Sequence, residues 1–165
     1  MISKRSAASR AARVLVSIAC WNASDIIGAT LEAVLHQTVS ADGILIVDYA
    51  STDGFAELKF PQIVTVIHNQ LNLRPSGALT TGIEYARAHG YNWIWVLDAD
   101  TRPRRGTLES LIRLTEADRN IGVVAPPQVS ARGKPTCSMT LRLIRAAIAN
   151  PDEAGLEFGK AFVLH

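Results

Sequence analysis

Five short apolar runs, rich in β-branched residues, alternate along this chain with segments of helical periodicity. Strands that are covered on both faces are hydrophobic at nearly every position, and in parallel sheets such strands alternate with helices. The sequence therefore predicts an α/β fold, with a mainly parallel sheet and helices on both of its faces. The predicted strands are residues 13–20, 43–48, 63–68, 92–98 and 121–125.

Three helices are predicted between these strands, because apolar residues recur there at spacings of three and four. They cover about residues 25–37, residues 76–89, and a segment that follows Gly106 and uses Thr107 as its N-cap. The expected inward faces are Ile27, Leu31, Val34 and Leu35 in the first helix, Leu79, Ile83 and Ala86 in the second, and Leu108, Leu111, Ile112 and Thr115 in the third.

The regular alternation stops after residue 127. We expect a further strand around residues 138–144, and residues 160–165 are strand-like again. A chain of 165 residues with 48% apolar residues is long enough for one domain with its own core. We therefore expect a single domain over residues 14–165, shortened at its C-terminal end.

The basic residues gather at the beginning of the chain. Its first thirteen residues contain Lys4, Arg5, Arg10 and Arg13 and no acidic residue. We interpret residues 1–13 as a flexible basic tail, with contact to anionic lipid headgroups as the alternative. The remaining residues are slightly acidic and carry no basic stripe, which argues against a nucleic-acid partner.

The chain shows no secretory signal and no segment that would span a bilayer, because its apolar runs are short and interrupted by polar residues. Cys20 and Cys137 lie far apart and lack the spacing of zinc ligands. They indicate reduced thiols and a cytoplasmic protein.

Two carboxylates lie at the end of the predicted strand 92–98. Asp98 and Asp100 are separated by one residue, so they are expected to project to the same side and to repel each other. A hard divalent cation such as Mg²⁺ or Mn²⁺, bridging substrate phosphates, would remove that conflict. The alternative is that one aspartate caps the following turn while the other is solvated.

Other strand ends carry polar or aromatic residues, where ligands bind to open parallel sheets. Asp48 could accept hydrogen bonds from the base or ribose of a nucleotide, or it could open an Asx-turn into residues 51–54. Trp21 could stack on a base or cover the sheet edge. Arg74, after Asn72 and before a predicted helix N-terminus, could hold a phosphate.

Taken together, these segments resemble the inverting family 2 glycosyltransferases of the GT-A fold, which move a sugar from a nucleotide-sugar donor to an acceptor. The similarity extends from about residue 14 to residue 126, and residues 72–82 correspond to the family's Asn- and Gly-rich loop and helix. The matching segments, in order, are VSIACWN at 16–22, LHQT at 35–38, IVDYASTDG at 46–54 and WVLDADTRP at 95–103.

The resemblance implies a Rossmann-like GT-A sandwich and a role for each matching residue. Trp21 and Asn22 would border the base, Asp48 would bond the base or ribose, and Asp98 would reach the ribose or the metal. Asp100 would be the main ligand of a Mn²⁺ or Mg²⁺ ion on the diphosphate. Asn72 and Arg74 would belong to the donor-binding loop. Three positions depart from the family pattern, namely Tyr49 and Thr80, where Asn is common, and Arg74, where Gly is common.

The general base of an inverting transfer cannot be assigned, because the family has it downstream of a strand resembling residues 159–164, and this chain ends at His165. We expect a metal-assisted glycosyltransferase of polysaccharide biosynthesis with a glycan or lipid-linked acceptor. The expected location is the cytoplasm, with peripheral contact at the inner membrane face. The alternative is a catalytically incomplete module, short in its acceptor half, that binds a nucleotide or a partner subunit. A nucleotidyltransferase is disfavoured because no Gly-rich phosphate loop follows the first strand.

Overall fold

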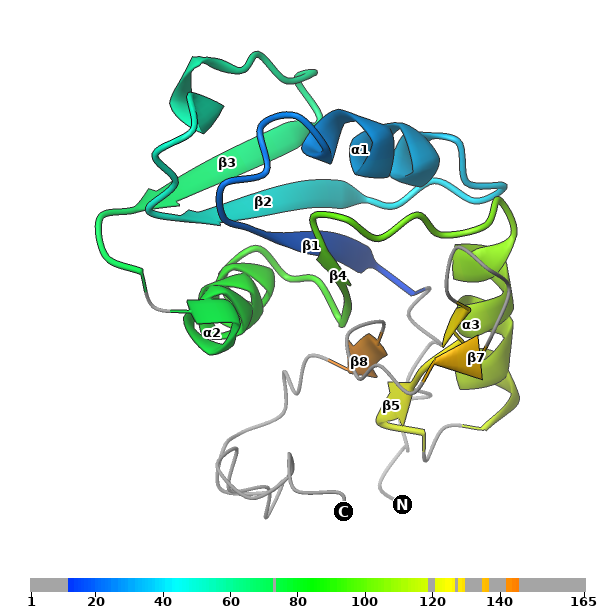
Figure 1. The fold of residues 1–165 in the computed structure, drawn as a ribbon. Helices are drawn as coiled ribbons and strands as arrows, with labels where there is room; N and C mark the ends of the chain where they lie inside the picture. Colours follow the sequence, from blue (N-terminus) through cyan, green and yellow to red (C-terminus); the bar gives the residue numbers. More distant parts are fainter. Residues whose placement is uncertain are drawn as a thin grey trace, which may run out of the picture.

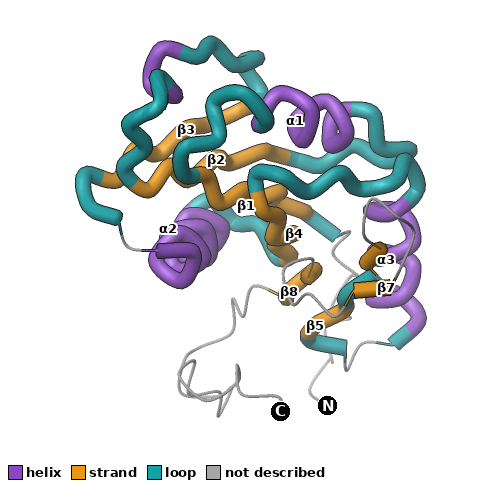
Figure 2. Tube along the Cα trace, in the orientation of Figure 1, coloured by secondary structure: helices purple, strands orange, loops and turns teal. Residues whose placement is uncertain are grey.

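The computed structural model describes residues 12–72, 74–118, 121–126, 128–129, 135–136 and 142–145. Figure 1 shows a twisted sheet between two layers of helices, and Figure 2 shows the same arrangement by type of element. The helices are α1 (Ile27–Leu35), η1 (Phe55–Glu57), α2 (Arg74–Ala88) and α3 (Thr107–Ala117). The strands are β1 (Val14–Cys20), β2 (Gly43–Tyr49), β3 (Val64–Asn69), β4 (Trp93–Asp98), β5 (Val123–Val124), β6 (Gln128–Val129), β7 (Pro135–Thr136) and β8 (Arg142–Arg145).

The main sheet has the strand order β3-β2-β1-β4-β8-β5. The four strands β3, β2, β1 and β4 are mutually parallel, as predicted, and β8 pairs antiparallel with both β4 and β5. The strand expected at 121–125 is only the two residues of β5, and β8 separates it from β4. An apolar pattern identifies a strand but not the strands that pair with it. The antiparallel position of β8 between β4 and β5 was therefore not predicted.

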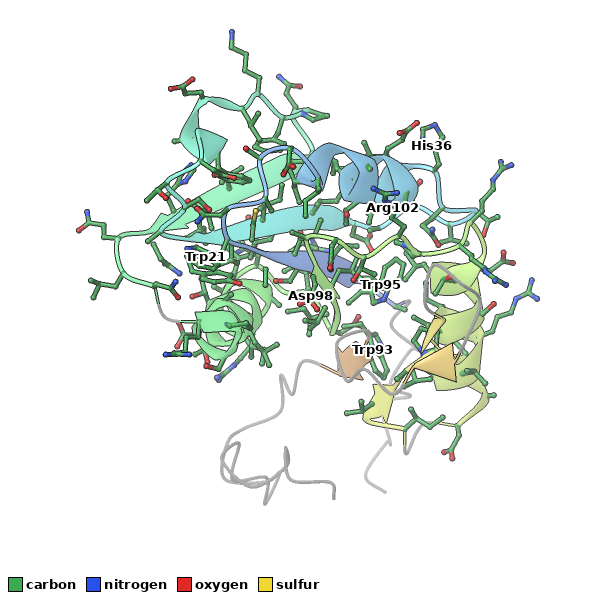
Figure 3. The ribbon with its side chains drawn as sticks, viewed as in Figure 1. Trp21, His36, Trp93, Trp95, Asp98 and Arg102 are labelled. Atoms are coloured by element: carbon green, nitrogen blue, oxygen red, sulfur yellow. The ribbon has the colours of Figure 1, made fainter. Side chains whose placement is uncertain are left out.

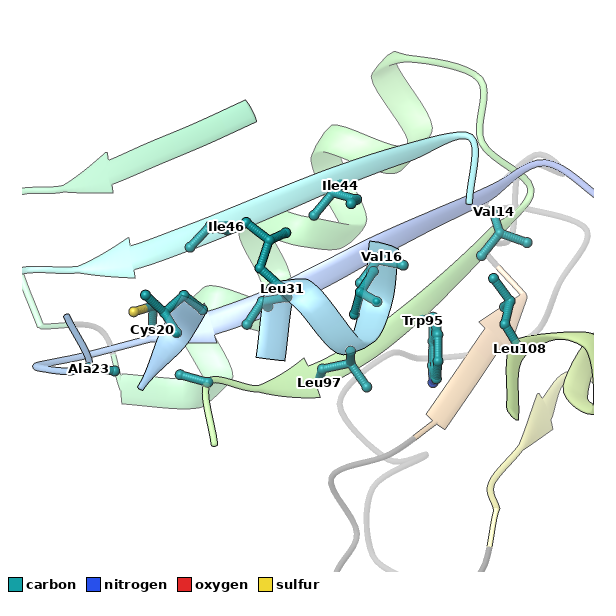
Figure 4. Close-up of a cluster of buried hydrophobic side chains, with 14 of the residues drawn as sticks. Val14, Val16, Cys20, Ala23, Leu31, Ile44, Ile46, Trp95, Leu97 and Leu108 are labelled. Atoms are coloured by element: carbon teal, nitrogen blue, oxygen red, sulfur yellow. The ribbon is translucent and has the colours of Figure 1, made fainter. Parts of the chain in front are cut away.

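Alternate residues of the central strands face two separate hydrophobic layers. One layer joins even-numbered residues of β1 and β2 and odd-numbered residues of β4 to α1 and α3, and Figure 4 shows part of it. The other joins Leu15, Leu45 and Val47 to α2. Helices on both faces explain why β1, β2 and β4 are apolar on both sides.

Small residues form the face of α2 that packs on the sheet. Its buried residues are Ala78, Gly82 and Ala86, whereas the predicted inward residues Leu79 and Ile83 are only partly buried. A Cβ atom at Gly82 would lie 2.4 Å from the Ser17 hydroxyl oxygen, so the helix backbone approaches β1 directly. Hydrophobic periodicity favoured the larger side chains, but close approach requires the smaller ones.

The other two long helices are placed as predicted, with differences at their ends. Leu35, expected inward, is 43% exposed, and Thr30 of α1 is buried instead. The expected N-cap Thr107 is the first residue of α3, and Gly106 occupies the cap position without a side chain to bond the helix. The Leu108 N–H donates instead to Oε1 of Gln37, which lies just beyond α1.

Arg13, assigned to the predicted tail, is attached to the domain. Its guanidinium lies 4.7 Å from the centre of the Tyr91 ring and donates to the carbonyls of His89 and Gly90. The rest of the predicted tail, apart from residue 12, lies outside the described residues, as do residues 160–165 and most of the strand expected at 138–144. None of the helices in the described part of the chain has the length and apolarity needed to cross a membrane.

Candidate functional site

The strand register brings three chain segments together at one edge of the sheet. Asp48 is the register partner of Cys20, and Asp98 is the register partner of Ala19, so the end of β1 lies between the two aspartates. The strand order changes direction between β1 and β4, and such a switch point is where open α/β sheets bind ligands. Figure 3 labels Trp21 and Asp98 where the chain leaves these two strands.

The two aspartates belong to different faces of the sheet. Val47, the residue before Asp48, faces α2, and successive side chains of a strand point to opposite faces. Asp48 therefore faces α1, as does its register partner Cys20. Asp98 follows Leu97 of the α1 layer and therefore projects toward the α2 side. A ligand at this edge would meet one carboxylate on each side of β1.

Asp48 is held by two donors of the chain itself. Its side chain is 6% exposed; Oδ1 accepts from the Ser51 N–H at 3.1 Å, and Oδ2 lies 3.0 Å from Nδ1 of His68. The first bond is the local turn contact that the sequence offered as the alternative to nucleotide binding. The second was not predicted, because it depends on the pairing of β3 with β2.

The negative charge of Asp48 affects the neighbouring thiol. Burial, with the charges of Asp48 and Asp53 as smaller contributions, raises the pKa of Cys20 to about 12. Cys20 is a free cysteine that is fully buried at the end of β1. It is therefore a protonated packing residue at neutral pH, in keeping with the prediction of a reduced thiol.

The loops that follow β1 and β2 are joined by side-chain hydrogen bonds. Asn22 Oδ1 accepts from the Thr52 N–H at 2.8 Å, and the Asn22 N–H donates to the Ser51 hydroxyl at 2.8 Å. The Ser24 N–H donates to Asp53 Oδ2 at 2.7 Å, and this bond is the largest cause of the lowered pKa of Asp53. The sequence STDG at 51–54 therefore fixes the β1 loop, with Gly54 at φ +82° where the chain turns.

Two aromatic rings lie at the same edge. Trp21 is 49% exposed, and its ring stacks on Tyr49 with centroids 6.4 Å apart and an interplanar angle of 17°. Burial raises the pKa of Tyr49, and the charge of Asp98 adds to the effect. Tyr49 therefore packs against the tryptophan within the electrostatic influence of the β4 aspartate, an arrangement that the sequence did not reveal.

A turn carries the two β4 aspartates. The Thr101 N–H donates to the Asp98 carbonyl at 3.1 Å, and the Thr30 hydroxyl of α1 donates to the Ala99 carbonyl at 2.5 Å. Ala99 is buried, Asp98 is partly exposed and Asp100 is exposed. The turn is thus fixed through its middle residue while the Asp100 side chain faces solvent.

Gln37 holds the chain beyond this turn. Its amide group donates to the carbonyls of Ala33 and Arg104 and accepts from the Leu108 N–H at 3.0 Å. The side chain is buried, so each of its polar atoms has a partner in the chain. Gln37 of the LHQT segment therefore positions the loop that follows Asp100.

Asn72 and Arg74 lie at the beginning of α2. Asn72 Oδ1 accepts from the Arg74 N–H at 3.0 Å, both side chains are exposed, and Arg74 has φ +60°. The helix begins at Arg74, two residues earlier than predicted. Their roles toward a donor remain predictions.

Asp98 and Asp100 have the chemistry of a hard-cation site. Both offer only oxygen, which Mg²⁺ and Mn²⁺ prefer, and the exposed Asp100 is accessible to a ligand. Within the described residues, no group of three His, Cys, Asp or Glu side chains could enclose a metal ion. A cation held by these two aspartates would have to take its remaining ligands from phosphate and water.

The strand order defines an α/β protein, and the polar strand ends make the switch between β1 and β4 its candidate ligand edge. The family model for Glycosyl transferase family 2 matches residues 15–164. The chain belongs to this family.

A curated relative is the galactofuranosyltransferase GlfT1 of Mycolicibacterium smegmatis. It is 29% identical over 104 residues, which are 62% of this chain and 34% of the relative. The chain thus spans about a third of the length of the curated relative that it matches.

Solved structures show the same fold. The mannosyltransferase PcManGT from Pyrobaculum calidifontis, in complex with GDP-Man and Mn²⁺, matches with a TM-score of 0.62 and 26% identity over 75% of this chain and 37% of that one. S. aureus TarS 1–349 in complex with UDP-GlcNAc matches with a TM-score of 0.69 and 18% identity over 82% of this chain and 46% of that one. These neighbours confirm the predicted GT-A architecture.

Proposed function

We propose that this chain is the donor-binding part of a glycosyltransferase that moves a sugar, with inversion, from a nucleoside-diphosphate sugar to a glycan or lipid-linked acceptor. The observation that carries the proposal is the register that brings Asp48 and Asp98 to either side of the end of β1. Membership of glycosyl transferase family 2 supports it.

In this proposal, the base of the donor lies over the β1 and β2 ends. Trp21 stacks on the base, with Tyr49 behind it, and Asn22 keeps the loop closed beside it. Asp48 accepts from an N–H of the base or a hydroxyl of the ribose. The exposed Arg74 and Asn72, at the beginning of α2, reach toward the phosphates or sugar.

The diphosphate lies beyond β4 in this arrangement. Asp98 reaches the ribose or a divalent cation, and Asp100 is the main ligand of that cation. The chemistry that a Mn²⁺ or Mg²⁺ ion supplies when bound is compensation of the negative charge that grows on the departing nucleoside diphosphate. The complex of PcManGT with GDP-Man and Mn²⁺ supports this assignment.

We assign no general base. The acceptor hydroxyl must lose a proton as it attacks the anomeric carbon, and none of the residues assigned above is proposed to accept this proton.

We also propose a role in polysaccharide biosynthesis in the cytoplasm, with peripheral contact at the inner membrane face. The basic residues among the first thirteen support that contact.

Calorimetric titration with UDP, GDP and dTDP, each with and without Mn²⁺, tests the proposal. We expect at least one nucleotide to bind, and Mn²⁺ to tighten its binding by about tenfold or more. The Asp100→Ala variant should lose the Mn²⁺ effect and keep its fold, because the side chain is exposed.

Failure of all three nucleotides to bind, or an Mn²⁺ effect that survives in Asp100→Ala, would contradict the proposal. A transfer assay with donor sugar then separates an active enzyme from the alternative, a module that binds nucleotide without turnover. Metal-dependent release of nucleoside diphosphate identifies the enzyme.

A further inference from the structure

Beyond the residues assigned above, His68 lies at the end of β3, where it is the register partner of Asp48. Its Nδ1 lies 3.0 Å from Asp48 Oδ2. A carboxylate can only accept hydrogen bonds, so Nδ1 carries the proton and donates. The His68 side chain is 49% exposed, while that of Asp48 is 6% exposed.

The His68 ring is itself held in place. Phe55 meets it edge to face, with centroids 5.9 Å apart and planes at 68°. Phe55 is buried and begins the short helix η1, directly after the STDG segment. The Phe55 N–H donates to Asp53 Oδ1, so the same segment that fixes the β1 loop also supports the histidine.

The Asp48 carboxylate therefore has one donor on each oxygen, Ser51 N–H on Oδ1 and His68 on Oδ2. Two donors on different sides fix the rotation of the carboxylate plane. Each oxygen has a second lone pair that can accept one further hydrogen bond. Because the carboxylate plane is fixed, the direction of this second lone pair is fixed as well.

We infer that His68 is a positioning residue for donor recognition: it orients Asp48 toward a nucleobase that presents a ring N–H. This inference rests on the proposed function and extends it to the class of base. Uracil, thymine and guanine carry such a group beside a carbonyl. A carboxylate held as an acceptor favours these bases, and His68 itself does not touch the ligand.

Two variants at this position separate the effect of the hydrogen bond to Asp48 from the effect of the volume of the His68 ring. In His68→Asn, the side-chain amide nitrogen occupies nearly the place of Nδ1 and keeps a donor for Asp48. In His68→Leu, a side chain of similar size lacks any donor. His89→Leu is the matched control, because His89 is exposed and stacks on Tyr85 at the end of α2.

The test measures binding of UDP, GDP, dTDP and inorganic pyrophosphate by calorimetry in the presence of Mn²⁺, with a thermal unfolding curve for each variant. For the nucleotide that the wild type binds best, His68→Leu should bind about tenfold more weakly, while His68→Asn and His89→Leu stay within about threefold of the wild type. Pyrophosphate has no base, so its affinity should be the same in all four proteins.

Three results would overturn the inference: unchanged nucleotide affinity in His68→Leu, an equal loss for nucleotide and pyrophosphate, or a loss in His68→Asn as large as in His68→Leu. The second result would indicate a general structural role. A wild-type chain that binds neither nucleotides nor pyrophosphate would refute the proposed function, and the inference with it.

Discussion

Cys20 is the residue where burial and neighbouring charge act together most strongly. Its pKa is raised to about 12, from the ordinary 9.0, chiefly by burial. The folded state therefore keeps the proton on the thiol in a range of pH where the unfolded chain loses it. This contribution to stability is complete below pH 9 and is lost as the pH rises toward 12.

We expect the free energy of unfolding of the wild type to fall as the pH increases from about 9, measured by urea unfolding at several pH values. Cys20→Ala should be less stable at neutral pH, because it leaves a small cavity, but its stability should fall less steeply above pH 9. Tyr91 also has a raised pKa and contributes equally to both proteins, whereas the raised pKa of Tyr49 depends in small part on Cys20 itself. Parallel curves for the two proteins would show that the thiol is not the titrating group.

At the scale of single residues, the sequence predicted which aspartates lie at the carboxyl ends of β2 and β4 but not what holds them. Asp48 and Asp98 were found because each ends a predicted apolar strand. The His68 contact depends on which strand pairs with β2 and in which register, and no local pattern carries that information. The same holds for Tyr49, which meets Trp21 only when β1 and β2 lie side by side.

At the scale of elements, the contact between α2 and β1 depends on the absence of a side chain. A Cβ atom at Gly82 would lie 2.4 Å from Ser17 Oγ and 3.2 Å from Ile94 Cδ1, whereas one at Gly28 of α1 would meet nothing within 4 Å. Gly82 lies in the middle of α2 and Gly28 in the first turn of α1, so alanine should improve helix propensity at both positions. Packing opposes this gain only at Gly82.

Gly82→Ala should therefore destabilise the protein by about 1–2 kcal/mol, because the helix must move away from β1. Gly28→Ala should stabilise it by about 0.5–1 kcal/mol. Urea unfolding measures both, and adding Ser17→Ala to Gly82→Ala should recover part of the loss. Equal effects of the two single substitutions would contradict the close packing of α2.

Element ends were the least predictable part of the fold. The first turn of α3 receives its cap from Gln37, which is 71 positions before Leu108 in the sequence. Sequence-based capping rules search the residues next to a helix and so selected Thr107. The residues between Asp98 and α3 are thus fixed by Thr30 of α1 and by Gln37, which lies just beyond this helix.

At the scale of the whole molecule, stability should decrease from the centre of the sheet to its β3 edge. β1 pairs on both sides, with β2 and β4, and six of its seven residues are buried. β3 pairs only with β2, and its residues are exposed or partly buried. The buried core of the sheet is therefore formed by β1, β2 and β4, and β3 contributes little to it.

Hydrogen exchange followed by mass spectrometry should show this gradient. We expect amides of β1 to exchange at least about tenfold more slowly than amides of β3, because β3 can open without disturbing the core. Equal protection of the two strands would contradict the arrangement of β3 as an edge strand. A nucleotide that binds in the presence of Mn²⁺ should slow the exchange of amides in the loops after β1 and β2.

We propose above that Asp98 and Asp100 bind a divalent cation that holds the diphosphate of the donor. The most direct test is diffraction near the manganese absorption edge from a crystal grown with UDP and Mn²⁺. We expect an anomalous peak for a manganese ion within bonding distance of the Asp100 carboxylate and of phosphate oxygens, with Asp98 beside it. A bound nucleotide without such a peak, with both carboxylates hydrogen-bonded to backbone amides instead, would contradict the proposal.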